Sequence, residues 1–273
     1  MHKEDLAERF PGVSFGENVR IGGNVRIDQR SSIGANTVIG DFSIIHANCH
    51  VGSNCNIGPY STIGEPCSSY YACPDEYVFP ETRIDSGSLI RSHAVIYASV
   101  IIGEHFQCGH RVTIREETII GRHVRIGTLS DIQGYCSIGS YVSLHSSVHV
   151  GQKSTIEDFV WIYPYTVLTN DPTPPSATLN GVTVKRFAVI ATATTILPGI
   201  VVEEDTLVGA HSLVRENVHT GTVVAGVPAK EIATIDKVKD KTTGECLYPW
   251  RFHFERGMPW EGVGYAVWAG QEK

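Results

Sequence analysis

The chain has 273 residues, and its 22 Lys and Arg against 29 Asp and Glu give a formal net charge of -7. An acidic chain with few cations lacks the positive field that nucleic-acid binding requires, so we expect no nucleic-acid partner. No apolar stretch reaches membrane-spanning length, and residues 1–11 lack a signal-peptide core. We therefore expect no membrane partner and a cytoplasmic location.

From Phe15 onward an aliphatic residue recurs at every sixth position, with two interruptions. A period of six matches neither the helical turn nor the alternation of an ordinary strand, so it predicts short strands that meet at regular corners. Glycine often follows the aliphatic residue, where we expect the corner to use its freedom at positive φ. The aliphatic positions form three runs: 15, 21, 27, 33, 39, 45, 51, 57 and 63; then every sixth residue from 84 to 168; then 184, 190, 196, 202, 208 and 214.

Three hexapeptides would make one triangular coil of about eighteen residues, and successive coils would stack at about 4.8 Å, the spacing of paired strands. Repeats of this length are typical of parallel β-helices, in which each coil buries its apolar residues only by stacking on its neighbours. The sequence therefore predicts an all-β parallel β-helix of about ten coils over residues 1–228. Within it lie two projecting loops, residues 65–83 and 169–183.

Residues 229–273 depart from the repeat. We expect a short helix around Lys230–Ile235, followed by an aromatic tail from Tyr248 to Trp268. Repeat proteins need a cap on their open ends, so the tail is expected to fold back over the prism or onto a neighbour and to cover the last coil.

Seven cysteines form an odd set without the paired spacing of a metal site, so no metal is expected. Four of them occupy repeat positions, where a cysteine behaves as a small core residue: Cys49, Cys55, Cys108 and Cys136.

The first loop concentrates Tyr70, Tyr71, Tyr77 and Phe79 among prolines. Aromatic side chains on a projecting loop either stack on a nucleotide base or pack against a neighbouring subunit. The second loop is rich in proline and begins with Asn170 and Asp171. These two residues either start a turn or present an amide and a carboxylate to a substrate.

His110 lies two residues after the inward Cys108, hence at a corner near the middle of the prism. Imidazole titrates near neutral pH, so a histidine in this place suits a general base that accepts a proton from an attacking amine or hydroxyl. His110, His145 and His149 also suggest a zinc set, as in a γ-class carbonic anhydrase.

The repeat, closed by the AGVPAK segment at residues 225–230, resembles the hexapeptide acyltransferases. These are left-handed homotrimers that move an acyl group from a thioester carrier at clefts between adjacent prisms. The GHRV segment at residues 109–112 resembles the stretch with the catalytic base in sugar N- and O-acyltransferases, including the lipid A acyltransferase. The resemblance implies that His110 is catalytic and that acetyl-CoA or another acyl-CoA is a co-substrate, with no tightly bound cofactor.

Positions eighteen apart should lie above one another, which places Thr128, Ser146, Thr192 and Ala210 above His110 if the second loop replaces only a corner. The resemblance implies that the Thr128 backbone N–H binds the developing oxyanion. It also implies that the coenzyme A arm runs along this edge toward its adenine end, past these residues: Ser146, Ala191, Thr192, Ala210 and Lys230.

Residues 109–134 together with residues 168–176 resemble the N-acyltransferases that acylate an amino-dideoxyhexose on a nucleoside diphosphate, enzymes of glycan and lipopolysaccharide biosynthesis. Some of these enzymes have no protein base, and the amine proton passes to the departing sulfur; His110 would then position the substrate. The resemblance implies a substrate site that comprises Arg115, Glu116, Glu117, Asp131, Asn170 and Asp171.

Three alternatives stay open. One is an O-acetyltransferase that acts on a free sugar, an amino acid or an antibiotic. Another is the γ-class carbonic anhydrase, although Arg115 stands where those enzymes have their second histidine. The last is a non-catalytic β-helix that serves as an assembly scaffold.

Overall fold

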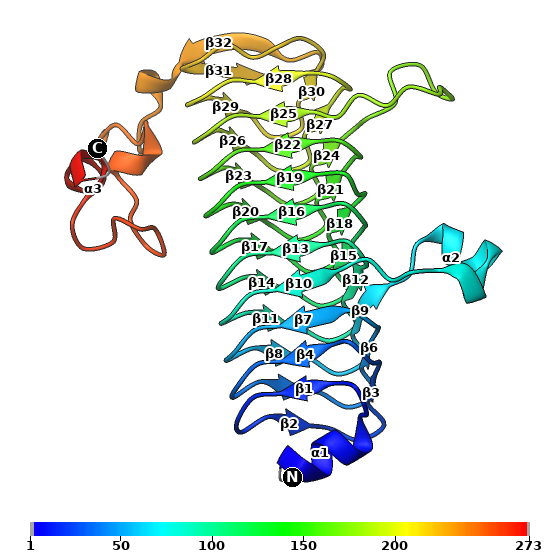
Figure 1. The fold of residues 1–273 in the computed structure, drawn as a ribbon. Coiled ribbons are helices and arrows are strands. Elements are labelled where there is room, and N and C mark those ends of the chain that lie inside the picture. Colours follow the sequence, from blue (N-terminus) through cyan, green and yellow to red (C-terminus); the bar gives the residue numbers. More distant parts are fainter. Residues whose placement is uncertain (1–2, 272–273) are drawn as a thin grey trace.

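The structure, a computed structural model, describes residues 3–271 and shows a triangular prism of stacked coils (Figure 1). The chain climbs the prism as a left-handed coil. Each strand pairs in parallel with the strand one coil later, as Thr113 pairs with Asp131 and Ile114 with Ile132. The predicted all-β, left-handed parallel β-helix is therefore confirmed.

Three sheets form the faces of the prism, here called faces A, B and C in chain order. Face A has ten strands: β1 (Ser14–Phe15), β4 (Ser32–Ile33), β7 (Cys49–Val51), β10 (Thr82–Ile84), β13 (Ile101–Ile102), β16 (Ile119–Ile120), β19 (Ser137–Ile138), β22 (Thr155–Ile156), β25 (Thr183–Val184) and β28 (Val201–Val202). Face C also has ten: β3 (Arg26–Ile27), β6 (Ile44–Ile45), β9 (Thr62–Glu65), β12 (Val95–Tyr97), β15 (Thr113–Ile114), β18 (Asp131–Ile132), β21 (His149–Val150), β24 (Val167–Leu168), β27 (Thr195–Ile196) and β30 (Leu213–Val214).

Face B is longer, with twelve strands where about ten coils were expected. Its regular strands are β2 (Arg20–Ile21), β5 (Val38–Ile39), β8 (Asn56–Ile57), β11 (Leu89–Ile90), β14 (Gln107–Cys108), β17 (Arg125–Ile126), β20 (Ser143–Leu144), β23 (Trp161–Ile162), β26 (Val189–Ile190) and β29 (Leu207–Val208). Beyond the last complete coil, β31 (Thr222–Ala225) and β32 (Lys230–Thr234) extend this face alone. The A–B, B–C and C–A corners are the short segments that join these faces.

The core is one continuous column of inward side chains, from Leu6 to Val224. Burial of each aliphatic side chain stabilises the fold by about 1.5–3 kcal/mol. The four repeat cysteines are buried and free, which confirms them as core residues. Burial raises the pKa of the Cys49 and Cys108 thiols to about 12, so neither can act as a thiolate nucleophile near neutral pH.

The corner glycines differ from expectation. Glycines that directly follow a strand, such as Gly22 and Gly109, do not have positive φ. They are needed because the next coil passes too close for a side chain, since a Cβ on Gly109 would lie 2.4 Å from the Thr128 nitrogen. Positive φ falls two residues later, on non-glycine residues such as Asn24 and Arg111.

The N-terminal end is covered by α1 (Lys3–Arg9), which contacts β1. Leu6 and Phe10 are buried there, and the ring centroid of Phe10 lies 5.9 Å from that of Phe15. At the other end, β32 pairs antiparallel with β31, so the helix expected around Lys230–Ile235 is wrong. A strand forms because it satisfies the backbone groups that β31 would otherwise leave unpaired at the sheet edge. The 3-10 turn η2 (Ile235–Lys237) follows.

The tail contains η3 (Trp250–Phe252) and α3 (Tyr265–Gln271) and folds back along the side of the prism. Its aromatic residues pack on Phe159 and Phe187 at the A–B corner, and Trp250 Nε1 donates a hydrogen bond to the Phe187 carbonyl at 2.9 Å. The expectation that the tail covers the last coil is therefore wrong, because its apolar rings find their partners on the side.

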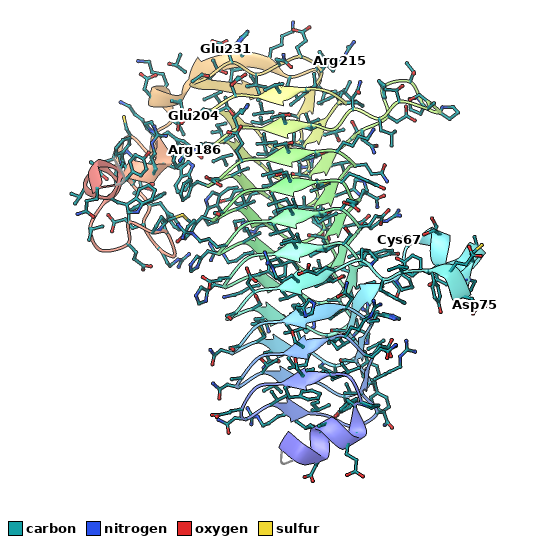
Figure 2. All side chains as sticks on the ribbon, viewed as in Figure 1. Cys67, Asp75, Arg186, Glu204, Arg215 and Glu231 are labelled. Atoms are coloured by element: carbon teal, nitrogen blue, oxygen red, sulfur yellow. The ribbon has the colours of Figure 1, made fainter. Side chains whose placement is uncertain are left out.

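Both loops leave the prism at the C–A corner, between β9 and β10 and between β24 and β25 (Figure 1). The first contains α2 (Ser68–Ala72) and the 3-10 turn η1 (Pro74–Glu76), and it extends from Cys67 beside the prism to Asp75 at its far end (Figure 2). Within residues 3–271, every helix is too short or too polar to cross a bilayer.

The two residues of β16 test which side chains of a strand point into the core. Ile120 is 2% exposed, and its neighbour Ile119 is 57% exposed. Ile120→Ala is expected to lower the free energy of unfolding by about 2–5 kcal/mol, because it leaves a cavity in the core. Ile119→Ala should change it by less than about 0.5 kcal/mol. Chemical denaturation of both variants checks this, and equal losses would contradict the assignment.

Candidate active site

The column of residues expected above His110 forms at the B–C corner. Backbone hydrogen bonds join each level to the next, from Leu129 N to the His110 carbonyl at 3.0 Å, and so on up to His211 N and the Thr192 carbonyl at 2.9 Å. The second loop does not disturb it, because Ala193 N donates to the Pro164 carbonyl at 2.9 Å. Ser146 and Ala210 are exposed, and Ala191 and Thr192 are half-buried. Lys230 is exposed on β32, at the far end of face B.

His110 is exposed and held at two points. Its Nδ1 lies 2.7 Å from the Ser92 hydroxyl, and its backbone N–H donates to Thr128 Oγ1 at 3.2 Å. The tautomer in which Nδ1–H donates to Ser92 leaves Nε2 as the basic nitrogen. The corner therefore presents an oriented imidazole to solvent.

The Thr128 backbone N–H is one of several corner amides, with those of Ser146 and Thr192, that have no acceptor in the described chain. At equivalent positions, Gly23 N donates to Asp41 Oδ1 at 2.7 Å, and His110 N donates to Thr128. Within residues 3–271, the Thr128 N–H has no such acceptor. An unpaired backbone N–H one coil above a histidine is suited to a developing oxyanion.

At the C–A corner, the predicted substrate residues Arg115, Glu116 and Glu117 are all engaged with protein groups. Arg115 forms a two-point ion pair with Glu116, at 2.9 and 3.0 Å, and its guanidinium lies 5.4 Å from the centroid of the Tyr97 ring. Glu117 accepts a hydrogen bond from the Ser99 hydroxyl at 3.0 Å. Because Glu116 is buried and paired, it holds Arg115 in place more readily than it meets a ligand.

Asp131 pairs with a residue that sequence reasoning did not assign to the substrate site. Asp131 Oδ2 lies 3.3 Å from His149 Nδ1, and Gln133 also donates to this carboxylate. Burial alone would raise the pKa of Asp131, but the hydrogen bonds from His149 and Gln133 outweigh it and lower that pKa. The signal was available in the sequence, because residues 131 and 149 occupy the same outward position one coil apart on face C.

The second loop uses Asp171 to hold its own turn. The carboxylate accepts hydrogen bonds from Thr173 N and Ser176 N, both at 3.1 Å, and from the Ser176 hydroxyl at 2.7 Å. The Ser176 hydroxyl is also the main cause of the lowered pKa of Asp171. Asn170 lies against Gly151, where an added Cβ would come within 3.0 Å of its own Cβ. Asp171 was expected either to start a turn or to present its carboxylate to a substrate, and these hydrogen bonds show that it forms a turn.

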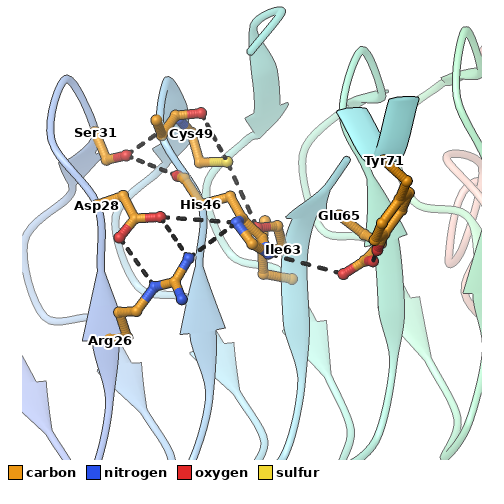
Figure 3. Close-up of polar contacts among 9 residues, drawn as sticks. Arg26, Asp28, Ser31, His46, Cys49, Ile63, Glu65 and Tyr71 are labelled. Atoms are coloured by element: carbon orange, nitrogen blue, oxygen red, sulfur yellow. Dashed lines mark hydrogen bonds and ion pairs between the residues drawn. The ribbon is translucent and has the colours of Figure 1, made fainter. Parts of the chain in front are cut away.

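The base of the first loop rests on a charged cluster around His46 (Figure 3). His46 lies between two carboxylates, 3.7 Å from Asp28 and 3.7 Å from Glu65, and Phe79 stacks on its ring with centroids 5.5 Å apart. The loop residue Tyr71 donates to Glu65 at 2.9 Å. These contacts fix the loop to face C just below Tyr97 and Arg115.

The three histidines named for the carbonic anhydrase alternative each contact a different protein group and do not form a metal site. His145 stacks on Tyr163, His149 pairs with Asp131, and His110 bonds to Ser92. Across the described part of the chain, no three His, Cys, Asp or Glu side chains gather to hold a metal ion.

The His46 cluster gives an expected pH dependence. Burial, followed by the charge of Arg26, lowers the pKa of His46 below its usual value. The unfolded chain, in which histidine titrates near about 6.5, therefore takes up this proton first as the pH falls, and stability decreases below that pH. His46→Gln should reduce the fall in the midpoint of thermal unfolding between about pH 7.5 and pH 5.5. An unchanged fall in the variant would show that His46 does not contribute.

Comparison with known families finds a match for one segment of the repeat. Residues 30–65 match the family model described as bacterial transferase hexapeptide (six repeats). No curated protein matches the sequence at a significant level.

Several solved structures are similar to this chain. UDP-N-acetylglucosamine O-acyltransferase from Moraxella catarrhalis is 16% identical, with 82% of this chain and 73% of that chain covered and a TM-score of 0.39. A putative acetyltransferase from Bacillus cereus is 20% identical, over 52% of this chain and 77% of that chain, with a TM-score of 0.38. Perosamine N-acetyltransferase from Caulobacter crescentus, in complex with CoA and GDP-perosamine, is 23% identical, over 54% of this chain and 56% of that chain, with a TM-score of 0.31.

By its register and its core the chain is a hexapeptide-repeat β-helix, and its residues 30–65 carry the repeat described for bacterial transferases.

Proposed function

We propose that the chain is an acyl-CoA-dependent N-acyltransferase that transfers an acyl group, in the simplest case acetyl, to the amine of a nucleotide-linked amino-deoxy sugar. One observation carries this proposal. His110, whose imidazole is oriented by Ser92, lies one coil below Thr128, whose backbone N–H is unpaired, on one exposed corner. Acyl transfer needs these two groups side by side, a base for the nucleophile and a donor for the oxyanion.

The reaction proceeds by direct attack. The neutral amine forms a C–N bond to the thioester carbonyl, and the oxyanion accepts a hydrogen bond from the Thr128 N–H. His110 Nε2 takes the amine proton and returns it to the coenzyme A sulfur as the C–S bond breaks. No acyl-enzyme forms, so no serine or cysteine nucleophile is required.

The acyl donor follows the B–C corner away from His110. Small exposed or half-buried side chains there, Ser146, Ala191, Thr192 and Ala210, allow a pantetheine arm to approach the backbone closely. Lys230, exposed beyond the last complete coil, offers an ammonium to a phosphate at the far end.

The acceptor side comprises the C–A corner, where Arg115 with its partner Glu116, Glu117 and Asn170 lie, and Asp131 on the adjoining face C. Within one chain this set and His110 occupy opposite edges of face C. A homotrimer with clefts between prisms would bring the C–A corner of one subunit to the B–C corner of the next. Asp171 contributes to this side by fixing the loop.

Substitution of His110 tests the base. His110→Ala is expected to lower kcat/KM by about 10²- to 10⁴-fold, the usual contribution of general-base assistance. His149→Ala is the matched comparison, since His149 is a half-buried histidine that is likewise oriented by a neighbour, the Asp131 carboxylate. Steady-state kinetics of both variants shows which histidine, His110 or His149, acts as the base. A near wild-type His110→Ala would mean that the amine proton passes to the departing sulfur or that His149 is the base.

The substrate class is tested with purified protein, several acyl-CoAs and a panel of dTDP- and UDP-linked amino sugars. Mass spectrometry should detect an amide product from at least one amino sugar, together with release of free coenzyme A. Free sugars, amino acids and aminoglycosides serve as the comparison panel. An ester product from that panel, with no amide, would favour an O-acetyltransferase, and no thioester consumption at all would favour a scaffold.

A further inference from the structure

A second site is formed where the aromatic tail meets face B. A cavity of about 280 Å³ opens between the prism residues Trp161 and Tyr163 and the tail residues Tyr248, Trp250 and Phe254. Tyr163 begins the B–C corner of a higher coil in the column above His110, whereas Trp161 lies on face B and the other three residues belong to the tail. The cavity exists only because the tail folds back along the side of the prism.

The walls are rings held at fixed angles. Trp161 meets Trp250 edge-on with centroids 6.1 Å apart, and it meets Phe254 edge-on at 5.5 Å. The hydrogen bond from Trp250 Nε1 to the Phe187 carbonyl holds the cavity wall that the tail forms against the prism. A rigid aromatic cavity favours a flat ring as its occupant. At about 280 Å³ it lies just below the range of about 300–1,000 Å³ for drug-sized ligands, so it suits one ring system rather than a whole cofactor.

Two polar atoms at this place lack partners. Trp161 Nε1 and His145 Nε2 are both buried, and neither has a hydrogen-bond partner in the described chain. His145 stacks on Tyr163 at 4.5 Å, and its ring centroid lies 6.1 Å from that of Trp161. An unpaired buried polar atom such as the Trp161 N–H costs about 1–3 kcal/mol. Trp161 lines the cavity, so an occupant whose acceptor atom bonds to its N–H would remove the cost at that atom.

Positive charge adjoins the cavity. The Arg125 guanidinium lies 5.5 Å from the centroid of the Trp161 ring. Arg125 and Arg91 line a neighbouring hollow of about 210 Å³, which reaches Gly109 and Ser146 beside the catalytic column. Among residues 3–271, neither arginine forms an ion pair with an acidic side chain. Aromatic cavities also accept quaternary ammonium ions, but the adjacent arginine and the unpaired Trp161 N–H disfavour a cation.

We propose that the aromatic cavity holds the base of a nucleotide and that Arg125 and Arg91 bind its phosphates. A flat ring with acceptor atoms, attached to an anionic group, meets all three features of the site. The proposal deepens the proposed function only in the choice of ligand, since both expected co-substrates carry a nucleotide. The site itself follows from the tail, the unpaired donors and the arginines.

The test measures binding to the full chain by titration calorimetry, without acyl transfer. The probes are coenzyme A and 3′,5′-ADP for the acyl carrier, and UDP and dTDP for the sugar nucleotide. Trp161→Phe retains a ring and removes the N–H, so it is expected to weaken the binding nucleotide by about tenfold, the effect of one lost hydrogen bond. Arg125→Gln should weaken binding of the same nucleotide more than Trp161→Phe does, and it should make that binding less dependent on salt concentration.

Trp268→Phe is the matched control, because Trp268 belongs to the same aromatic cluster but does not line the cavity. It should bind the nucleotide as the wild type does. Circular dichroism verifies that each variant is folded, and Arg125→Gln, a change on the outer surface of face B, keeps the test decisive if Trp161→Phe is unstable.

Different results separate this inference from the proposed function. If no probe binds, or if Trp161→Phe and Arg125→Gln bind it like the wild type, the cavity is not a nucleotide site, even where acyl transfer is observed. If a probe binds and both variants weaken it, the inference holds, even where no acyl transfer is detected. The probe that binds identifies the co-substrate whose base enters the cavity.

Discussion

Every coil of this protein must pair its backbone with the coil above it, and the remaining features depend on that pairing. Strand hydrogen bonds connect residues eighteen apart, as in Asp131 with His149, while the inward aliphatic side chains close the core behind them. A coil that lost this register would expose its aliphatic residues and leave its backbone groups unpaired at once. The register therefore also fixes which side chains stand together outside, including His110 beneath Thr128.

The two loops illustrate how the prism accepts insertions. Both leave at the C–A corner, and after the second loop the pairing resumes with Thr155 opposite Thr183. Because the inserted residues replace only a corner, the strands above and below remain hydrogen-bonded, and the B–C corner column continues unbroken to Ala210. One corner of the prism can thus vary in length while the opposite edge keeps its spacing.

Much of the fold could be predicted from the sequence, because a six-residue period states directly which side chains point inward. Ile126 and Cys108 follow from it, and so does the column above His110. The need for glycine at position 109, where the next coil leaves no room for a side chain, could not be predicted, because the period gives no information on how closely two coils approach. The tail and β32 were misjudged for a related reason. Their positions depend on partners far away in sequence, Phe187 for Trp250 and the open edge of β31 for Lys230–Thr234.

The corners of the early and later coils differ in which residues adopt positive φ. Non-glycine residues at positive φ are strained unless they are asparagine or aspartate, whose short polar side chains tolerate that region best. In the first coils this place is often taken by asparagine: Asn18, Asn24, Asn36, Asn48 and Asn54. Later in the described chain no asparagine occupies it, and the residues there include His105, Arg111, Glu117 and Tyr165. The early coils therefore more often place at their corners the residue that tolerates this conformation best, whereas most later coils place larger side chains there at a cost in backbone strain.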